Sequence, residues 1–396
     1  ENSISFDENF LDSKLSLANL ENDFGNYQRA IEILNNVTSS NKSNHQILTR
    51  SKIIMGNVLR SKGDYNGAIE LNKNALEMDS TNIDASYNLS LCYLFIKDYE
   101  KAWKFHEARY NLQSFVLLKK MHDAFRKPRW DNNKPKKNIL FYGEQGIGEQ
   151  ILYSQFYDAV QDQLKNITIA VNQKLIPFFK KIYNNVEIID YRLISNYDNY
   201  EYHLPMGSMG LYFQNNFNFH NYKNIDYLSY KNIAPKKNKR LRCGISWKST
   251  NKIFGNKKSV KLEHFKNLFL ADEIEFINLQ YTNEEKEIGS LEEKINKNIF
   301  LDHKIDCFND INGVASLIKS CDFVITVSNS NAHISGKLGV KTFLLLPFSD
   351  GKLWYWGLNT DNEVIWYPSI KPLRMEKEND WNSCIINLEK ELENFL

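Results

Sequence analysis

The residue types best suited to chemistry gather at 143–149, where the chain reads Gly-Glu-Gln-Gly-Ile-Gly-Glu. The apolar run 139–142 predicts a buried strand before them, and apolar residues at 147, 151, 152, 156 and 160 predict an amphipathic helix after them. Gly146 and Gly148 let the backbone approach a ligand closely, while the new helix directs free N–H groups to the same place. Glu149 adds a carboxylate where that helix begins. The spacing is not the dinucleotide pattern Gly-x-Gly-x-x-Gly, so an ordinary strand-to-helix turn is the alternative.

A second stretch, 321–339, repeats this design. Four small polar residues follow a predicted strand at 323–327 and suit a turn and a helix N-cap; they are Ser328, Asn329, Ser330 and Asn331. The amides at the start of the next helix could grip a diphosphate. His333 lies in the first turn and could donate a hydrogen bond to the same anion. The alternative is a structural histidine, since a lone histidine beside an apolar helix is more often of that kind.

Lysines and hydroxyls follow another predicted strand, 243–247. Trp247 ends it, Lys248 follows in a polar loop, and Lys258 and Ser259 come just before a predicted helix near 262. Point charges and donors at strand ends suit phosphate oxygens, whereas the alternative is a set of solvated loop lysines. The aromatic clusters at 354–356 and 366–367 are expected to be mainly core.

Composition limits the classes of protein that can carry these stretches. The 396 residues are 42% hydrophobic and 25% charged, which is typical of globular chains and long enough for two or three domains. No apolar run approaches the roughly 20 residues that span a bilayer. A net charge of +2 argues against bulk nucleic-acid binding. Five widely spaced cysteines without a Cys-x-x-Cys pair predict reduced thiols and a cytoplasmic protein.

Internal repeats define the N-terminal third of the chain. Tyr65 and Tyr99 lie 34 residues apart, as do Ala68 and Ala102, and a third copy surrounds Tyr27. This is the tetratricopeptide period, and three copies predict an α-solenoid within residues 1–112. The stack could be a spacer or a surface for homo-oligomerisation, or it could hold a protein substrate in a concave groove.

The rest of the chain predicts two α/β domains. Residues 113–137 contain prolines and a basic run, and predict an ordered connector. Strands alternate with helices over 138–235, a Pro- and Lys-rich linker follows near 234–240, and a second alternating unit occupies 236–396. Such alternation predicts parallel sheets with helices on both faces.

Six motifs together carry a family resemblance. They occur in the order Gly-Glu-Gln-Gly-Ile-Gly-Glu (143–149), Gly-Ile-Ser-Trp-Lys (244–248), Leu-Gln-Tyr (279–281), Thr-Val-Ser-Asn-Ser-Asn-Ala-His-Ile-Ser-Gly-Lys-Leu-Gly (326–339), Leu-Leu-Leu-Pro-Phe (344–348) and Trp-Tyr-Pro-Ser (366–369). The chain resembles bacterial tetratricopeptide-repeat glycosyltransferases of the GT-B fold, which are related to the lipopolysaccharide heptosyltransferases and more distantly to O-GlcNAc transferase. The resemblance covers essentially the whole chain. It implies two Rossmann-like domains facing a cleft, with the acceptor on the first and the nucleotide sugar on the second.

The resemblance also implies roles for particular residues. Heptosyltransferases carry an Asp after the glycine turn as the proposed general base, and the matching residue here is Glu149, with Glu144 as the alternative. Their donor-domain turn often starts with Asp, where this chain has Ser328. The expected donor-binding set is Gly146, Gly148, Trp247, Lys248, Lys258, Ser259, Gln280, Ser328, Asn329, Ser330, Asn331 and His333.

The leading hypothesis is an inverting, metal-independent glycosyltransferase that uses a nucleotide sugar as co-substrate, with no further cofactor. No Asp-x-Asp motif is present, and Asp302, Asp306 and Asp310 are too widely spaced to form one. The acceptor would be a hydroxyl of a protein or glycan. The alternative is a non-catalytic module in which the repeats recruit a partner and the α/β unit only binds a nucleotide or sugar. The sugar, the nucleotide, the acceptor and the oligomeric state all stay open.

Overall fold

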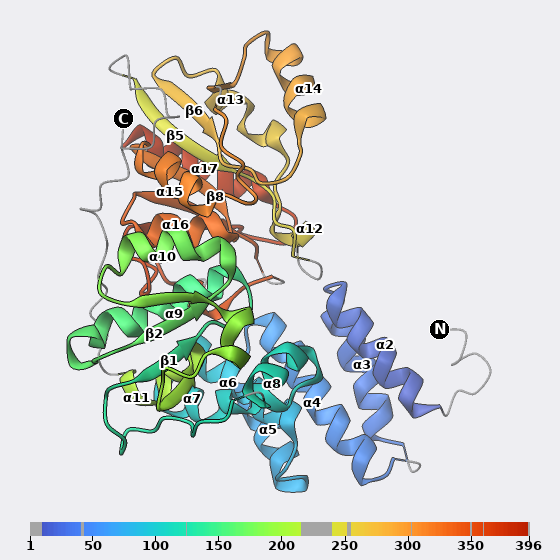
Figure 1. Ribbon diagram of the computed structural model, residues 1–396. Helices are drawn as coiled ribbons and strands as arrows, with labels where there is room; N and C mark the ends of the chain where they lie inside the picture. The colour runs from blue at the N-terminus through green and yellow to red at the C-terminus, as the bar shows by residue number, and fades with distance from the viewer. Residues whose placement is uncertain are drawn as a thin grey trace. The chain divides into compact units, whose positions relative to one another are not determined.

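The computed structural model of the protein describes residues 10–40, 43–123, 125–214, 240–251, 255–301, 303–348, 351–358 and 360–394. Contacts between residues divide the chain into two compact units, Glu1–Asp123 and Ala124–Leu396. The first unit, blue to cyan in Figure 1, is helical, and the second, green to red, contains two sheets with helices around them. None of the described helices is long and apolar enough to cross a membrane.

The first unit is a stack of helical hairpins. Its helices are α2 (Leu11–Asp23), α3 (Tyr27–Thr38), α4 (His45–Lys62), α5 (Tyr65–Met78), α6 (Ile83–Phe95) and α7 (Tyr99–His106), followed by the short helices η1 (Glu107–Asn111) and η2 (Gln113–Phe115) and by α8 (Val116–Asp123). The tyrosine of each sequence repeat begins the second helix of a hairpin. The predicted α-solenoid is therefore confirmed.

The small residues of the repeats lie where the helices pack. Ala30, Ala68 and Ala102 are completely buried. Gly63 ends α4 with a φ of 90°, a left-handed conformation that glycine adopts without a Cβ penalty. The same position of the last repeat holds Lys97, with a φ of 64°. The repeat pattern thus encodes both the crossing of two helices and the turn between them.

The first α/β domain contains a four-stranded parallel sheet in the order β3-β2-β1-β4. Its strands are β1 (Ile139–Tyr142), β2 (Thr168–Val171), β3 (Glu187–Asp190) and β4 (Tyr202–Pro205). Its helices include α9 (Ile147–Val160), α10 (Ile176–Ile182) and α11 (Gly210–Phe213), with the short turns η3 (Gln161–Gln163), η4 (Gln173–Leu175), η5 (Tyr191–Asn196) and η6 (Met206–Ser208). The glycine turn leaves the carboxyl end of β1, an inner strand of the sheet.

The second α/β domain contains a six-stranded parallel sheet in the order β10-β9-β8-β5-β6-β7. Its strands are β5 (Leu241–Ser246), β6 (Ile274–Asn278), β7 (Phe300–Leu301), β8 (Phe323–Val327), β9 (Thr342–Leu346) and β10 (Ile370–Arg374). Its helices are α12 (Gly255–Lys258), η7 (Leu262–Phe265), α13 (Lys266–Phe269), α14 (Glu285–Ile295), α15 (Ile311–Lys319), α16 (Ser330–Lys337), η8 (Trp354–Trp356) and α17 (Trp381–Glu393). An apolar cluster joins the strands to η7, α13, α14 and α17.

These two sheets confirm the predicted order of a solenoid followed by two parallel α/β domains. The predicted connector 113–137 is divided between the two units. Its first part forms α8 within the helical unit, whereas its second part packs on the first sheet, where Phe125 stacks on His203 and Trp130 is completely buried. The predicted linker near 234–240 and the boundary at 235 and 236 lie outside the described residues, except for position 240.

Candidate functional site

A cavity of about 380 Å³ lies between the two α/β domains, at the carboxyl ends of their strands. Parallel sheets commonly bind ligands at this edge, because loops and helix N-termini converge there. The cavity is lined by Gly146, Ile147, Gly148, Glu149, Asn172, Lys174, Ser249, Thr250, Asn251, Lys258, Tyr281, Cys307, Phe308, Ile311, Ser328, Asn329, Ser330, His333, Leu353 and Tyr355. The glycine turn at 143–149 and the small polar turn at 328–330, both singled out in the sequence, therefore face one cavity.

The turn after β1 presents Glu149 to this cavity. Gln145 adopts a left-handed φ of 62°, which turns the chain sharply before α9 begins. Gly146 is the N-cap, and a Cβ there would lie 2.8 Å from Glu149 Oε2, so the carboxylate folds back over the start of its own helix. Tyr355 Oη donates a hydrogen bond to Glu149 Oε1 across 3.1 Å. Burial and the nearby Glu149 carboxylate raise the pKa of Tyr355 well above its usual value, which keeps this hydroxyl a donor.

The alternative base, Glu144, lies elsewhere. Its side chain is 3% exposed, and its Oε1 accepts a hydrogen bond of 2.7 Å from the backbone N–H of Gly207. It does not line the cavity. Of the two predicted carboxylates, the structure brings Glu149 into the cavity and leaves Glu144 in the wall of the first domain.

His333 lies in α16, opposite the start of α9. A Cβ on Gly148 would lie 2.6 Å from His333 Cδ2, so the close approach of the two helices depends on this glycine. The imidazole is 3% exposed, its Nδ1 lies 3.1 Å from Tyr367 Oη, and its ring contacts Tyr355 and Trp356. Burial and then Lys258 lower the pKa of His333 to about 3. His333 is therefore neutral near pH 7 and can act on an anion as a hydrogen-bond donor, without a positive charge.

The depressed pKa predicts a dependence of stability on pH. The folded protein keeps His333 neutral while the unfolded chain binds a proton near pH 6.5, so the contribution is full above pH 6.5 and is lost as the pH falls towards 3. Going from pH 6.5 to 5.5 should cost on the order of 1 kcal/mol of unfolding free energy through this residue. Denaturant titrations of the protein and of His333→Gln should give a shallower pH slope for the variant. Parallel slopes would show that His333 keeps its ordinary pKa.

Lys258 provides the cationic side of the cavity. It ends the short helix α12 and is 4% exposed. Among the described residues, no hydrogen bond or ion pair engages its ammonium group, which lines the cavity. Burial lowers the pKa of Lys258, and the nearby Glu149 carboxylate partly opposes that shift. A largely buried ammonium that none of the described residues bonds suits an anion, because burying a charge without a bonded partner is costly.

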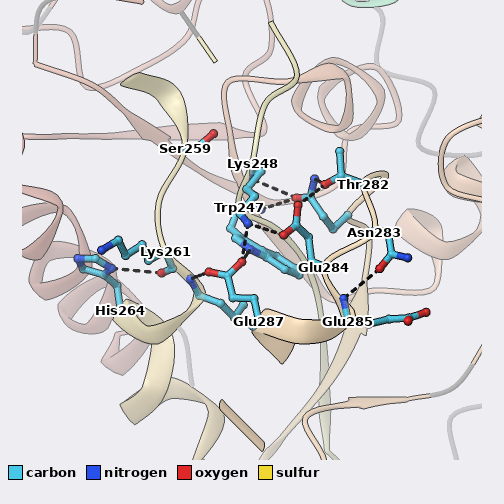
Figure 2. Close-up of polar contacts among 12 residues, drawn as sticks. Trp247, Lys248, Ser259, Lys261, His264, Thr282, Asn283, Glu284, Glu285 and Glu287 are labelled. Carbon is cyan, nitrogen blue, oxygen red and sulfur yellow. Dashed lines mark hydrogen bonds and ion pairs between the residues drawn. The ribbon is translucent and has the colours of Figure 1, made fainter. Parts of the chain in front are cut away.

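Lys248, the other predicted phosphate ligand, belongs to a separate network (Figure 2). Its Nζ forms ion pairs with Glu284 and, at 2.7 Å, with Glu287. Glu287 also accepts hydrogen bonds from Trp247 Nε1 and from the backbone N–H of Leu262. The two carboxylates raise the pKa of Lys248 against the effect of burial. Lys248 does not line the cavity, because it lies two residues beyond Ser246, the end of β5, and its side chain turns towards α14.

Four other predicted donor residues support the loops instead of lining the cavity. Gln280 Oε1 accepts from the backbone N–H groups of Trp247 and Lys248 at 3.0 Å. Asn331 Nδ2 donates to the Leu279 carbonyl, and Ser259 Oγ accepts from the backbone N–H of Ser249. Trp247 is completely buried. These residues fix the loops that carry Ser249 to Asn251 and the turn before α16.

The turn before α16 does reach the cavity through Ser328, Asn329 and Ser330. Asn329 is the N-cap, and its Oδ1 accepts from the backbone N–H of Asn331 at 2.9 Å. Its Nδ2 donates to Ser246 Oγ and to the Lys248 carbonyl, which ties the ends of β5 and β8 together. The turn is therefore held in place by its own side chains, with the start of α16 directed at the cavity.

Several lining residues had no role in the sequence-based prediction. Lys174 comes from the first domain, and its Nζ donates to the Phe308 carbonyl of the second domain across 2.9 Å and lies 3.5 Å from the Phe308 ring centroid. Tyr281 adds a hydroxyl that accepts from the backbone N–H of Thr250. Tyr355 belongs to an aromatic cluster that the sequence analysis assigned to the core. Its partner Glu149 is 206 positions away, so spacing gave no signal of the contact.

Comparisons with known proteins agree with parts of this description. Residues 56–94 match the family described as "TPR repeat", which confirms the tetratricopeptide prediction. A relative, Protein FlbA of Caulobacter vibrioides (strain ATCC 19089 / CIP 103742 / CB 15), is 22% identical over 292 residues. The match includes 67% of this chain and 48% of FlbA, so the chain spans about half the length of that relative.

Solved structures of two bacterial transferases resemble the chain. The glycosyl transferase family 9 protein of Veillonella parvula DSM 2008 is 11% identical, with 65% of this chain and 95% of that chain covered and a TM-score of 0.46. The ADP-heptose LPS heptosyltransferase II of E. coli is 10% identical, with 65% of this chain and 100% of that chain covered and a TM-score of 0.43. The two α/β domains are established by the sheets described above. Within the described part of the chain, no group of three or more His, Cys, Asp and Glu residues could hold a metal ion.

Proposed function

We propose that the chain is a glycosyltransferase that moves a sugar from a nucleotide-sugar donor to a hydroxyl group of a protein or glycan. One observation carries the proposal: Glu149 from the first α/β domain and Lys258 from the second, whose ammonium bonds to none of the described residues, line the same cavity. A carboxylate that can accept a proton and a cation that can hold a diphosphate are the two groups that such a transfer needs.

The proposed reaction is a single displacement. Glu149 removes the proton of the acceptor hydroxyl, the oxygen attacks the anomeric carbon, and the bond from that carbon to the nucleoside diphosphate breaks. The leaving diphosphate gains negative charge, which Lys258, the amides at the start of α16 and the neutral imidazole of His333 stabilise. Attack opposite the leaving group inverts the anomeric centre. These protein groups supply the charge stabilisation without a metal ion.

The experiment that tests this function starts with a thermal-shift screen of UDP-, GDP-, CMP- and ADP-sugars. The nucleotide sugar that raises the melting temperature most is then incubated with the protein, and release of the nucleoside diphosphate is measured. Release, with or without an acceptor, supports an active site. Binding without any turnover would favour the alternative, a non-catalytic module that binds a nucleotide or sugar.

The solenoid offers a place for a protein acceptor. A hollow of about 690 Å³ within it is lined by Asn19, His45, Gln46, Thr49, Arg50, Ile53, Ile54, Asn57, Met78, Asp79, Asn82 and Asp84. Most of these side chains can donate or accept hydrogen bonds, which suits a polypeptide with unpaired backbone groups. We therefore propose that the repeats select the acceptor.

Deletion of residues 1–123 tests the role of the repeats. Since this segment forms a compact unit of its own, the remaining protein should bind the nucleotide sugar as tightly as the full chain does. Transfer to a protein acceptor should fall, and donor hydrolysis should not. Calorimetry with the donor and a transfer assay on the acceptor give the two readouts. Full transfer by the shortened protein would make the repeats a spacer or an oligomerisation surface. Homo-oligomerisation, the absence of a further cofactor and a cytoplasmic location stay predictions.

A further inference from the structure

A second polar cluster joins the two α/β domains behind the cavity. Lys337 of α16 forms an ion pair with Asp158 of α9, and both side chains are completely buried. Lys337 Nζ also lies 2.9 Å from Ser154 Oγ, 3.3 Å from Gln155 Oε1 and 2.9 Å from Tyr183 Oη. These four acceptors come from the first domain, whereas the ammonium comes from the second. The cluster is therefore a single interdomain joint made of directional bonds.

This joint shares its two helices with the cavity. Lys337 follows His333 by one turn of α16, and Asp158 lies further along α9, the helix whose first turn contains Gly148 and Glu149. The contact between the two helices thus includes Gly148 against His333 at the cavity and Asp158 against Lys337 behind it. We call these two contacts the α9–α16 seam. Together these two contacts fix the orientation of α9 relative to α16 and its position along α16.

The segment 366–369, which follows η8 in the chain, packs against this seam. Gln155 Nε2 donates to the Trp366 carbonyl across 3.1 Å, and a Cβ on Gly336 would lie 2.5 Å from the Tyr367 ring. The Trp-Tyr-Pro-Ser segment at 366–369 therefore contacts both helices. Its Tyr367 hydroxyl in turn reaches His333. The pairing of α9 with α16 and the position of His333 are parts of one packed arrangement.

Stability alone does not account for a buried ion pair here. Burying an ammonium and a carboxylate has a large desolvation cost, and apolar residues of the same size often serve stability as well or better. Burial lowers the pKa of Lys337, and the Asp158 carboxylate opposes that shift. Apolar side chains can slide over one another with little change in energy, whereas the Lys337 ammonium reaches these acceptors together only in one register.

We propose that Lys337 and Asp158 are positioning residues that fix the register of α9 against α16, and that they thereby hold Glu149 opposite the donor-binding side of the cavity. The register claim rests on the seam alone, and its consequence for the rate rests on the proposed function. A displacement of about 1 Å at a reacting group can lower a rate roughly 100-fold.

The test replaces the pair by apolar residues of similar size, Lys337→Met with Asp158→Leu. Each single variant leaves one buried charge unpaired and should melt at a lower temperature, whereas the double variant should recover most of that loss. Spin labels at the exposed positions Lys180 in α10 and Glu293 in α14 report the distance between the two domains by double electron–electron resonance. Cys307 is first replaced by serine, because its half-buried thiol could also take a spin label, whereas the other four cysteines are buried.

We expect a narrow distance distribution for the parent protein and one at least twice as broad for the double variant. Donor hydrolysis by the double variant should fall roughly 100-fold, even with the melting temperature restored. The control is Arg242→Met with Glu275→Leu, which removes an ion pair inside the second domain between the buried Arg242 and the half-buried Glu275. That control should change the melting temperature and leave the distance distribution narrow.

Each outcome bears on a different claim. A narrow distribution in the double variant overturns the positioning role, whatever the hydrolysis rate. A broad distribution with normal hydrolysis supports the register claim and counts against Glu149 as the base, so it weakens the proposed function instead. If the apolar pair does not fold, Lys337→Gln with Asp158→Asn removes the charges while keeping amides that can pair, and the same broadening is expected.

Discussion

Replacing Glu149 by glutamine should lower the single-turnover rate of sugar transfer by roughly two to four orders of magnitude, the usual contribution of a general base. Glutamine keeps the shape of the side chain and can still accept the hydrogen bond from Tyr355 Oη, so the cavity should stay intact. Donor affinity should therefore change little, because the amide fills the same space as the carboxylate and differs only in that it cannot take a proton. Single-turnover kinetics with saturating donor isolate the chemical step.

Glu144→Gln is the matched control. The new amide oxygen can keep the bond to the backbone N–H of Gly207, and the position lies outside the cavity, so the rate should stay near normal. If Glu149 only stabilised the N-terminus of α9 electrostatically, Glu149→Gln would lower the free energy of unfolding by about 0.3–1 kcal/mol and leave the rate near normal. A near-normal rate for Glu149→Gln with a collapsed rate for Glu144→Gln would move the base to Glu144.

Much of the fold could be predicted because short local patterns of apolar residues specify its strands. The buried runs at 139–142, 168–171 and 323–327 became β1, β2 and β8, since a parallel strand covered on both faces reads as a short apolar run. Strand β4 was missed because it does not read as a short apolar run. It contains His203 and ends at Pro205 in an Asn- and Tyr-rich region, and its partner β1 is far away in the chain.

The site was predictable to the extent that it lies at strand ends. The turns that carry Glu149 and Asn329 were found because glycines and small polar residues after an apolar run mark such ends. The sequence could not separate Lys248 from Lys258, since both follow β5 and differ only in where their ammonium groups lie. Lys248 meets carboxylates at 284 and 287, which only folding brings to it. The sequence spacing of the residues does not reveal tertiary contacts of this kind.

Lys258→Met should weaken binding of the nucleotide sugar about 10- to 100-fold, because a hydrogen bond to a charged group contributes roughly 1.5–3 kcal/mol. The melting temperature of the unliganded protein should stay the same or rise. Lys258 is 4% exposed and none of the described residues bonds its ammonium, so methionine removes a buried charge while keeping the packing of the stem. Calorimetry with the donor and thermal melts without it provide the two measurements.

Lys257→Met is the control on the same short helix, because Lys257 does not line the cavity. Its donor affinity should match that of the parent protein, and so should its dependence on salt. In the parent, donor affinity should fall as ionic strength rises, and Lys258→Met should flatten this dependence because one contact with the diphosphate is lost. The opposite pair of results, a lower melting temperature with unchanged affinity, would make Lys258 a structural residue. Such a loss of stability without loss of binding would count against Lys258 as the cation that holds the leaving group.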